Sequence, residues 1–184
     1  MKLQIYELSH PIIKIILNEI ENNENDYKYI GLLLMYEILR NYISIKKIYI
    51  KKIKAIKEFN TINKNEKHFL LTNISNTYDM ISEIKVIVPN IKIIHIDYSS
   101  TDKIEQSIKN LEISNNNTKI FIIEKITINE QISNLINYLI HNKQIDSKYI
   151  NIGCVISHQK SLEQIANQYP KLKVYTTKII YNNK

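Results

Sequence analysis

Glycine is nearly absent from this 184-residue chain, which contains only Gly31 and Gly153. Loops that bind phosphate usually need glycine, because their backbone N–H groups approach the anion closely and at φ values where a Cβ atom causes strain. A phosphate-binding loop in this protein would have to be built without it. This absence constrains function more than any residue that is present.

Cysteine is limited to Cys154, and tryptophan is missing. Cys154 has no partner within the chain, and the apolar run around it favours a buried strand residue over a catalytic nucleophile. No apolar stretch reaches the roughly 18 residues of a membrane span, and the N-terminus does not resemble a signal peptide. We therefore expect a soluble protein with no membrane partner, in a reducing compartment.

Arginine occurs once, at Arg40, so the formal net charge of +7 comes from lysine. Arginine supplies the bidentate fork that reads guanine edges and phosphates, whereas lysine acts as a point charge. We therefore do not expect a nucleic-acid partner. The alternative is that the lysine-rich segment 46–57 binds nucleic acid or another anion; otherwise it is the solvated face of a strand or hairpin.

Isoleucine, asparagine and lysine are over-represented, whereas alanine, valine, proline and arginine are scarce. The favoured residues have A/T-rich codons and the scarce ones G/C-rich codons. This bias indicates an A/T-rich genome such as that of an organelle. We expect the protein inside a plastid or another organelle, with the cytoplasm as the alternative.

Short apolar runs alternate with helical stretches along most of the chain. Two helices are predicted first, one from Pro11 and one over residues 27–40. Strands are then predicted at residues 69–74, 91–96, 119–123, 150–156 and 172–176, separated by helices at 78–88, 101–111, 129–142 and 161–168. This alternation predicts an α/β fold with a twisted, mainly parallel five-stranded sheet flanked by helices. We expect a single domain over residues 1–184, with an N-terminal helical segment (1–45) and an α/β core (68–178).

Polar residues follow the predicted strands at the edge where open parallel sheets bind ligands, in segments 72–77, 97–101, 124–129 and 157–160. Glu124 is the best candidate for a functional residue, although an acidic residue leaving a strand is equally well explained as a turn or cap. Lys125 can pair with Glu124 or supply a weak phosphate contact. Thr127 and Asn129 can cap the next helix without any substrate.

Two other kinds of chemistry are not expected. The histidines share no metal-ligand spacing with cysteine or acidic residues, so we predict no metal site. No serine has the G-x-S-x-G context of a hydrolase nucleophile. We assign no catalytic residue.

Several short segments resemble the uracil phosphoribosyltransferase family in the family's order. His10 and Pro11 match the start of its first helix, and Tyr36 and Glu37 a pair in its second. Segment 120–124 resembles the strand before the family's phosphoribosyl diphosphate loop, and segment 169–176 its closing strand. The resemblance implies a type I phosphoribosyltransferase fold, an ancestral conversion of uracil and phosphoribosyl diphosphate to uridine monophosphate and diphosphate, help from Mg²⁺, and oligomers.

The chain departs from the family where the family binds its substrates. Positions of the family's diphosphate-loop arginine and glycines fall at Ser75, Asn76, Thr77 and Asp79. In segment 124–132, which corresponds to the family's phosphoribosyl loop, only the acidity of Glu124 survives clearly. The family's glycine-rich tail that recognises uracil has no counterpart before residue 184.

We therefore predict a degenerate homologue of pyrimidine-salvage ancestry, acting as a homo-oligomer (a dimer) or with a protein partner. Mg²⁺ and phosphoribosyl diphosphate are expected only if the ancestral activity survives, at the vestigial positions Glu124, Lys125, Thr127 and Asn129. One alternative is an active uracil phosphoribosyltransferase. The other is a lysine-rich module that binds anions or nucleic acid.

Overall fold

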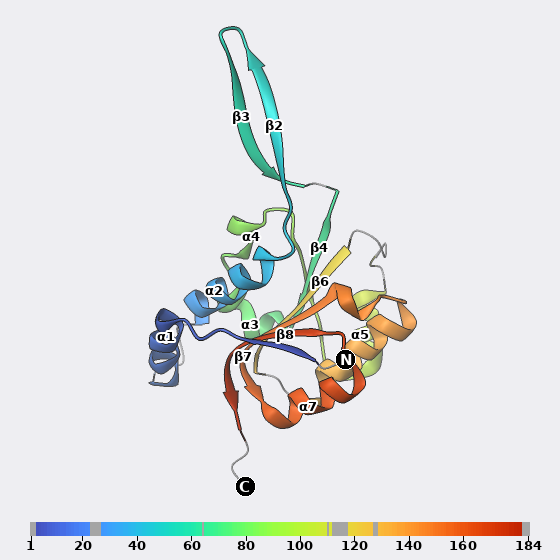
Figure 1. Cartoon of the computed structure of the whole chain (residues 1–184). Coiled ribbons are helices and arrows are strands. Elements are labelled where there is room, and N and C mark those ends of the chain that lie inside the picture. The colour runs from blue at the N-terminus through green and yellow to red at the C-terminus, as the bar shows by residue number, and fades with distance from the viewer. Residues whose placement is uncertain are drawn as a thin grey trace.

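The computed structural model describes residues 3–22, 27–63, 65–109, 111, 118–126 and 129–181. Six parallel strands form one sheet in the order β1-β8-β7-β6-β4-β5 (Figure 1). The strands are β1 (Gln4–Glu7), β4 (Lys67–Thr72), β5 (Lys92–His95), β6 (Thr118–Ile126), β7 (Ile150–His158) and β8 (Lys173–Ile180). The central strands are almost wholly buried, as expected where helices cover both faces of a parallel sheet.

The parallel α/β fold is confirmed, but the predicted sheet was one strand short. The five predicted strands are all present, and β1 joins β8 at the sheet edge as a sixth. All four residues of β1 are exposed. Because β1 is short and exposed, it lacks the apolar run from which the other strands were predicted.

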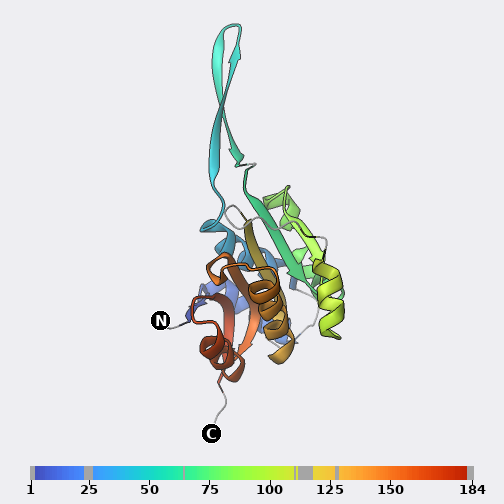
Figure 2. The same ribbon diagram turned by 90° about the vertical axis from the view of Figure 1, so that its right-hand side faces the viewer.

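The helices pack in two layers (Figure 2). One face of the sheet is covered by α1 (Pro11–Asn22), α2 (Tyr27–Arg40), α3 (Ile74–Ile81) and α4 (Ile84–Ile87), and the other by α5 (Thr101–Ile108), α6 (Asn129–Asn137) and α7 (Gln159–Gln168). Each layer has its own apolar core against the sheet. Within the described residues, no helix is long and apolar enough to cross a membrane.

Two predicted helices differ in detail. The helix predicted at 78–88 begins earlier, at Ile74, and breaks after Ile81, where the Ser82 hydroxyl donates to the Asp79 carbonyl at 3.0 Å. Such a side-chain bond competes with helical hydrogen bonding. The helix predicted at 129–142 becomes π-helical over Tyr138–Asn142, and a 3₁₀ turn (Ser147–Tyr149) then leads into β7.

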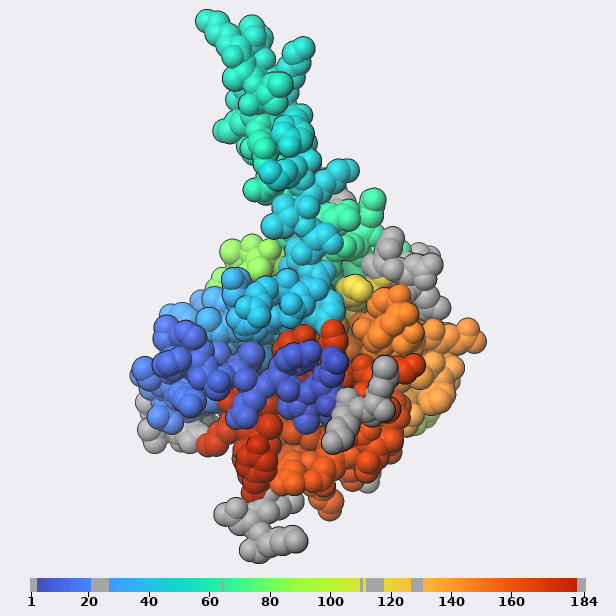
Figure 3. All heavy atoms as spheres, viewed as in Figure 1, coloured from blue at the N-terminus to red at the C-terminus, as the bar shows by residue number. Residues whose placement is uncertain are grey.

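A hairpin of β2 (Ile45–Lys52) and β3 (Ala55–Ile62) projects from the body (Figures 1 and 3). It contains segment 46–57, for which the sequence left open a solvated strand or hairpin. Every residue of β2 is exposed. An isolated two-stranded hairpin is at best marginally stable in water.

Both glycines lie inside regular elements at sites of close packing. Gly31 is in α2, where a Cβ atom would clash with the backbone of Met80 in α3. Gly153 is in β7, where a Cβ atom would lie 2.6 Å from Ile38 Cδ1 and 2.7 Å from Ile123 Cδ1. Neither has positive φ. The chain's two glycines therefore serve packing and do not form a phosphate loop.

Candidate functional site

The carboxyl ends of β4 and β6 define the candidate site. These strands are neighbours, but α3 follows β4 on one face of the sheet and α6 follows β6 on the other. Such a reversal is the topological switch point at which open α/β sheets bind ligands.

Glu124 fills this crevice from β6. Its side chain is buried, with 8% of the residue exposed. Oε1 accepts a hydrogen bond from the backbone N–H of Asn73 at 3.1 Å and another from the Tyr98 hydroxyl at 2.8 Å. The carboxyl group therefore ties β6 to the chain segments that follow β4 and β5.

Burial raises the pKa of Glu124 to about 7, although the hydrogen bonds from Tyr98 and Asn73 oppose the shift. Burial and the neighbouring carboxylate also raise the pKa of Tyr98 well above its usual range, so Tyr98 stays a donor. None of the ion pairs among the described residues includes Glu124. The site thus holds an acidic group whose charge is not neutralised by a salt bridge.

The N-terminus of α3 is already occupied by groups of the protein. Asn73 N–H donates to Glu124, and Ile74 N–H donates to Nδ1 of His95 at 3.2 Å. The N–H groups of Asn76 and Thr77 donate to the Asn73 carbonyl at 3.0 and 3.1 Å. An anion held by the N–H groups of Asn73 or Ile74 would have to displace Glu124 or His95.

Two threonine hydroxyl groups stabilise the junction of β4, α3 and β6. Thr72 Oγ1 donates to the Ile123 carbonyl at 2.5 Å, and Thr77 Oγ1 donates to the Asn73 carbonyl at 2.8 Å. Both threonines are fully buried. These bonds hold the start of α3 against β6 and favour a fixed loop.

The other predicted site residues contribute less. Lys125 Nζ lies 4.1 Å from the centre of the Tyr27 ring, and it forms no ion pair with Glu124 within the described structure. Thr127 lies outside the described residues, and Asn129 opens α6 but its side chain is not described. Glu124 and Lys125 share a pocket of about 350 Å³ with Ser75, Asn76 and Ile126.

Sequence reasoning missed His95 and Tyr98 as members of this site. Strand register could have found His95, because it pairs with Thr72 at the ends of β5 and β4. Tyr98 lies three residues further, in one of the segments expected on the ligand side. What the sequence did not reveal is that both would bond to groups around Glu124.

Cys154 is fully buried in β7, as predicted. Its Sγ lies 2.9 Å from Ser157 Oγ, and burial raises its pKa to about 11. The thiol is therefore protonated near neutral pH and has no access to substrate.

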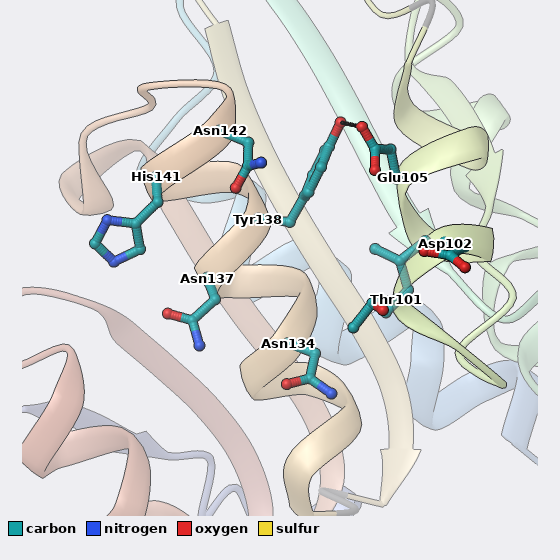
Figure 4. Close-up of a pocket in the computed structure, with 9 residues that line it drawn as sticks. Thr101, Asp102, Glu105, Asn134, Asn137, Tyr138, His141 and Asn142 are labelled. Atoms are coloured by element: carbon teal, nitrogen blue, oxygen red, sulfur yellow. Dashed lines mark hydrogen bonds between the residues drawn. The ribbon is translucent and has the colours of Figure 1, made fainter.

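A second hollow of about 380 Å³ lies between α5 and the π-helical turn (Figure 4). The Tyr138 hydroxyl donates to Glu105 at 3.4 Å, while His141 points away from Glu105 and Asp102. In the part of the chain that the structure describes, no three histidine, cysteine or acidic residues are grouped to hold a metal ion.

An all-parallel sheet with helices on both faces and a buried carboxyl group at the switch point defines an open α/β protein with a candidate ligand site at the carboxyl ends of its strands. The model of the family "Uracil phosphoribosyltransferase" matches residues 11–182. The chain therefore belongs to the uracil phosphoribosyltransferase family.

Two relatives carry the name "Uracil phosphoribosyltransferase homolog". The one from Pyropia yezoensis is 25% identical, over 99% of this chain and 91% of its own length. The one from Porphyra purpurea is 23% identical, over 97% of this chain and 89% of its own length. Among solved structures, the AQ2163 protein from Aquifex aeolicus has the same fold, with a TM-score of 0.69 at 16% identity over 98% of this chain and 89% of that one.

Proposed function

We propose that the protein is a catalytically degenerate member of its family that acts by association. The observation that carries the proposal is the hydrogen bond from Asn73 N–H to Glu124, because it places the protein's own carboxyl group at the helix end where an anionic substrate would be held. In this proposal the protein descends from a family that salvages uracil and has lost that family's catalytic activity.

Transfer of a phosphoribosyl group requires stabilisation of the departing diphosphate by cations and N–H donors. Positions 75–77 carry no positive side chain, and Asp79 is acidic. Arg40, the sole arginine, pairs with Glu37 at 3.2 Å. A diphosphate here would meet Glu124, and the one cation among the described side chains of the pocket is Lys125, with no arginine to bind the diphosphate.

Mg²⁺ does not fit the residues present. The ion prefers an octahedral set of oxygen ligands that includes carboxylates. Among the described side chains that line the pocket, Glu124 is the one acidic group, and its Oε1 already accepts two hydrogen bonds.

Association is proposed to use the hairpin. Its exposed large side chains include Ile48, Tyr49, Ile50 and Phe59 on the paired strands and Ile53 at the turn. Three or more strands, or packing on another surface, are needed for such a pair to be stable. A second copy of the chain can provide that surface.

The surface between β1, α1 and α2 complements the hairpin. Its hollow of about 350 Å³ is mainly apolar and includes Glu7 and Glu37 together with the exposed Ile12 and Tyr36. The hairpin carries six lysines and one glutamate between residues 45 and 62. Two copies that exchange hairpins would form a symmetric dimer with this contact made twice.

Sedimentation equilibrium tests this arrangement. We expect about twice the chain mass of 21.8 kDa for the natural protein, and dimerisation at least about tenfold weaker for Ile48→Thr/Phe59→Thr, because apolar surface is lost from the contact. The control Tyr78→Ser/Val86→Thr changes one aromatic and one aliphatic exposed residue on α3 and α4. A monomeric natural protein, or equal weakening by the control, would overturn the hairpin contact.

We also propose an organelle interior as the protein's location. The codon bias behind the abundant isoleucine, asparagine and lysine supports it. Fractionation of cells followed by detection with an antibody would test it, and recovery in the cytoplasm alone would contradict it.

A further inference from the structure

Asn151, the second residue of β7, is a fully buried amide without a hydrogen-bond partner. Its exposed fraction is 0%, and within the described residues neither Nδ2 nor Oδ1 is bonded. Buried polar groups are almost always paired, because an unpaired one loses its hydrogen bonds to water and gains nothing in return. Such an amide is a candidate to hold a ligand that accepts from Nδ2 and donates to Oδ1.

The strand register places two lysines beside this amide on one face of the sheet. Asn151 is opposite Lys173 of β8 on one side and Phe121 of β6 on the other. Lys119 comes two residues before Phe121, so both face the same way, because side chains alternate along a strand. Phe121 belongs to the apolar core beneath α2. Lys119 and Lys173 therefore flank β7 on the α2 face, at the opposite end of the sheet from Glu124 (Figure 1).

Tyr42, which follows α2, joins these side chains. The centre of its ring lies 5.9 Å from Lys119 Nζ and 5.3 Å from Lys173 Nζ, and 5.9 Å from the centre of the Phe121 ring. Burial raises the pKa of the Tyr42 hydroxyl, so it keeps its proton. Two ammonium groups that approach one ring converge over the strand that carries Asn151, and cation–π contacts of this kind order a lysine without neutralising its charge.

Acidic residues leave both lysines unpaired. Neither Lys119 nor Lys173 belongs to an ion pair among the described residues. Burial lowers the pKa of His68, and the charge of Lys119 acts in the same direction. Glu66 lies 3.7 Å from His68, but its carboxylate accepts from the hydroxyl and the backbone N–H of Ser44 at 2.5 and 3.4 Å. The surroundings of Asn151 are therefore positive.

A hollow of about 620 Å³ leads from solvent to Lys173, which is one of its lining residues. The hollow also contains two acidic residues. Glu37 pairs with Arg40 at 3.2 Å, and Glu7 lies near the far end of β1, where the residue opposite Lys173 is the neutral Gln4. An anion can therefore approach Lys173 from this side.

We propose that Asn151, Lys119 and Lys173 bind inorganic hydrogen phosphate. The ammonium groups supply positive charge, as lysine does in many phosphate sites, and Nδ2 of Asn151 donates to a phosphate oxygen. Oδ1 of Asn151 can only accept, so the ligand must also carry an O–H group, which hydrogen phosphate does. Sulfate and the dianions of phosphate esters, phosphoribosyl diphosphate among them, lack this O–H group and are disfavoured.

Calorimetric titration with sodium phosphate at pH 8 tests the proposal, with sodium sulfate and phenyl phosphate compared at equal ionic strength. Phosphate should bind, and the other two should bind at least about thirtyfold more weakly, because they leave Oδ1 against a ligand oxygen. Lys119→Gln/Lys173→Gln should weaken phosphate binding about tenfold or more. The control Lys14→Gln/Lys160→Gln removes the same charge from exposed positions on α1 and α7 and should bind as the natural protein does.

Asn151→Leu separates binding from stability. It should bind phosphate at least about tenfold more weakly, yet unfold at a higher urea concentration in phosphate-free buffer, because an apolar side chain of similar size replaces an unpaired buried amide. The exposed Asn167→Leu on α7 is its control and should change neither property in this way.

Three results would overturn the proposal: no binding of phosphate by the natural protein, normal binding by Asn151→Leu or by the lysine variant, or sulfate binding as tight as that of phosphate. Equal weakening by the controls would also contradict it. Circular dichroism verifies that each variant is folded. If Asn151→Leu does not fold, the lysine variant and the comparison of ligands decide the outcome.

Discussion

Glu124 occupies the crevice at the carboxyl ends of β4 and β6 and links the chain segments that meet there. It contributes a carboxyl group to a crevice with a tyrosine hydroxyl and a backbone N–H, but with no salt bridge in the described structure. A buried carboxylate without a cation is unfavourable, which is why its pKa is raised. Because its pKa is raised, Glu124 changes protonation near neutral pH, so stability measured across that range reports on the site.

Stability should depend on pH through this group. Below about pH 4.5 Glu124 is protonated in the folded and unfolded states alike. Between 4.5 and about 7 the folded protein retains a proton that the unfolded chain has lost, so the contribution of Glu124 to the free energy of unfolding decreases as pH rises. Above about 7 the full penalty, about 3 kcal/mol at most, remains.

Glu124→Gln should remove this decline. The amide oxygen can still accept from Asn73 and Tyr98, while the charge is gone, so the variant should be more stable than the natural protein at pH 8 and similar at pH 4.5. Urea unfolding across this range measures the effect. The exposed Glu163→Gln on α7 serves as control, and an unchanged pH dependence in Glu124→Gln would refute the assignment.

The candidate site was predictable only in part from single residues. Glu124 was found because an acidic residue ends a run of apolar strand residues. Its partners were not, because hydrogen bonds to Asn73 and Tyr98 depend on how three chain segments meet. The sequence suggested two partners for Lys125, Glu124 and a phosphate. It did not indicate the Tyr27 ring, which lies almost a hundred residues earlier in the chain.

At the scale of elements, close packing of α2 on α3 depends on Gly31. A methyl group there meets the backbone of Met80, which cannot rotate away, whereas at Gly153 it meets the ends of the Ile38 and Ile123 side chains. Backbone contacts yield less readily than side-chain ends. The two glycines should therefore respond differently to the same substitution.

Gly31→Ala should lower the free energy of unfolding by roughly 2 kcal/mol, because overpacking outweighs the gain in helix propensity. Gly153→Ala should produce a smaller loss, because the isoleucine side chains can adjust. Urea unfolding of both variants compares them directly. If Gly31→Ala were as stable as the natural protein, the contact between α2 and α3 would have to be looser than described.

The elements that sequence predicted well are those with buried apolar runs, such as β6 and β7. The elements that it missed lack this signal: β1 is exposed, and the break after Ile81 is marked only by the hydrogen bond from the Ser82 hydroxyl to the Asp79 carbonyl. The hairpin was foreseen as one option for segment 46–57, but its projection from the body was not. Whether the hairpin projects depends on which surfaces of the molecule the rest of the chain covers.

For the whole molecule, the apolar pattern preserves the family's fold while the loops have changed. Packing requires only apolar residues of suitable size at the right spacing, which isoleucine provides throughout this chain. Phosphate binding requires particular backbone shapes and cations, and these are the features missing at positions 75–79. A member of the family can therefore retain its fold after its chemistry is lost.

Calorimetric titration of phosphoribosyl diphosphate with Mg²⁺, with and without uracil, tests the central claim most directly. The natural protein should show no binding at millimolar ligand, because its own groups occupy the N-terminus of α3. Glu124→Ala should not create an active site, since no arginine replaces the carboxylate. Micromolar binding by the natural protein that Glu124→Ala abolishes would contradict the account and restore Glu124 as a substrate-binding residue.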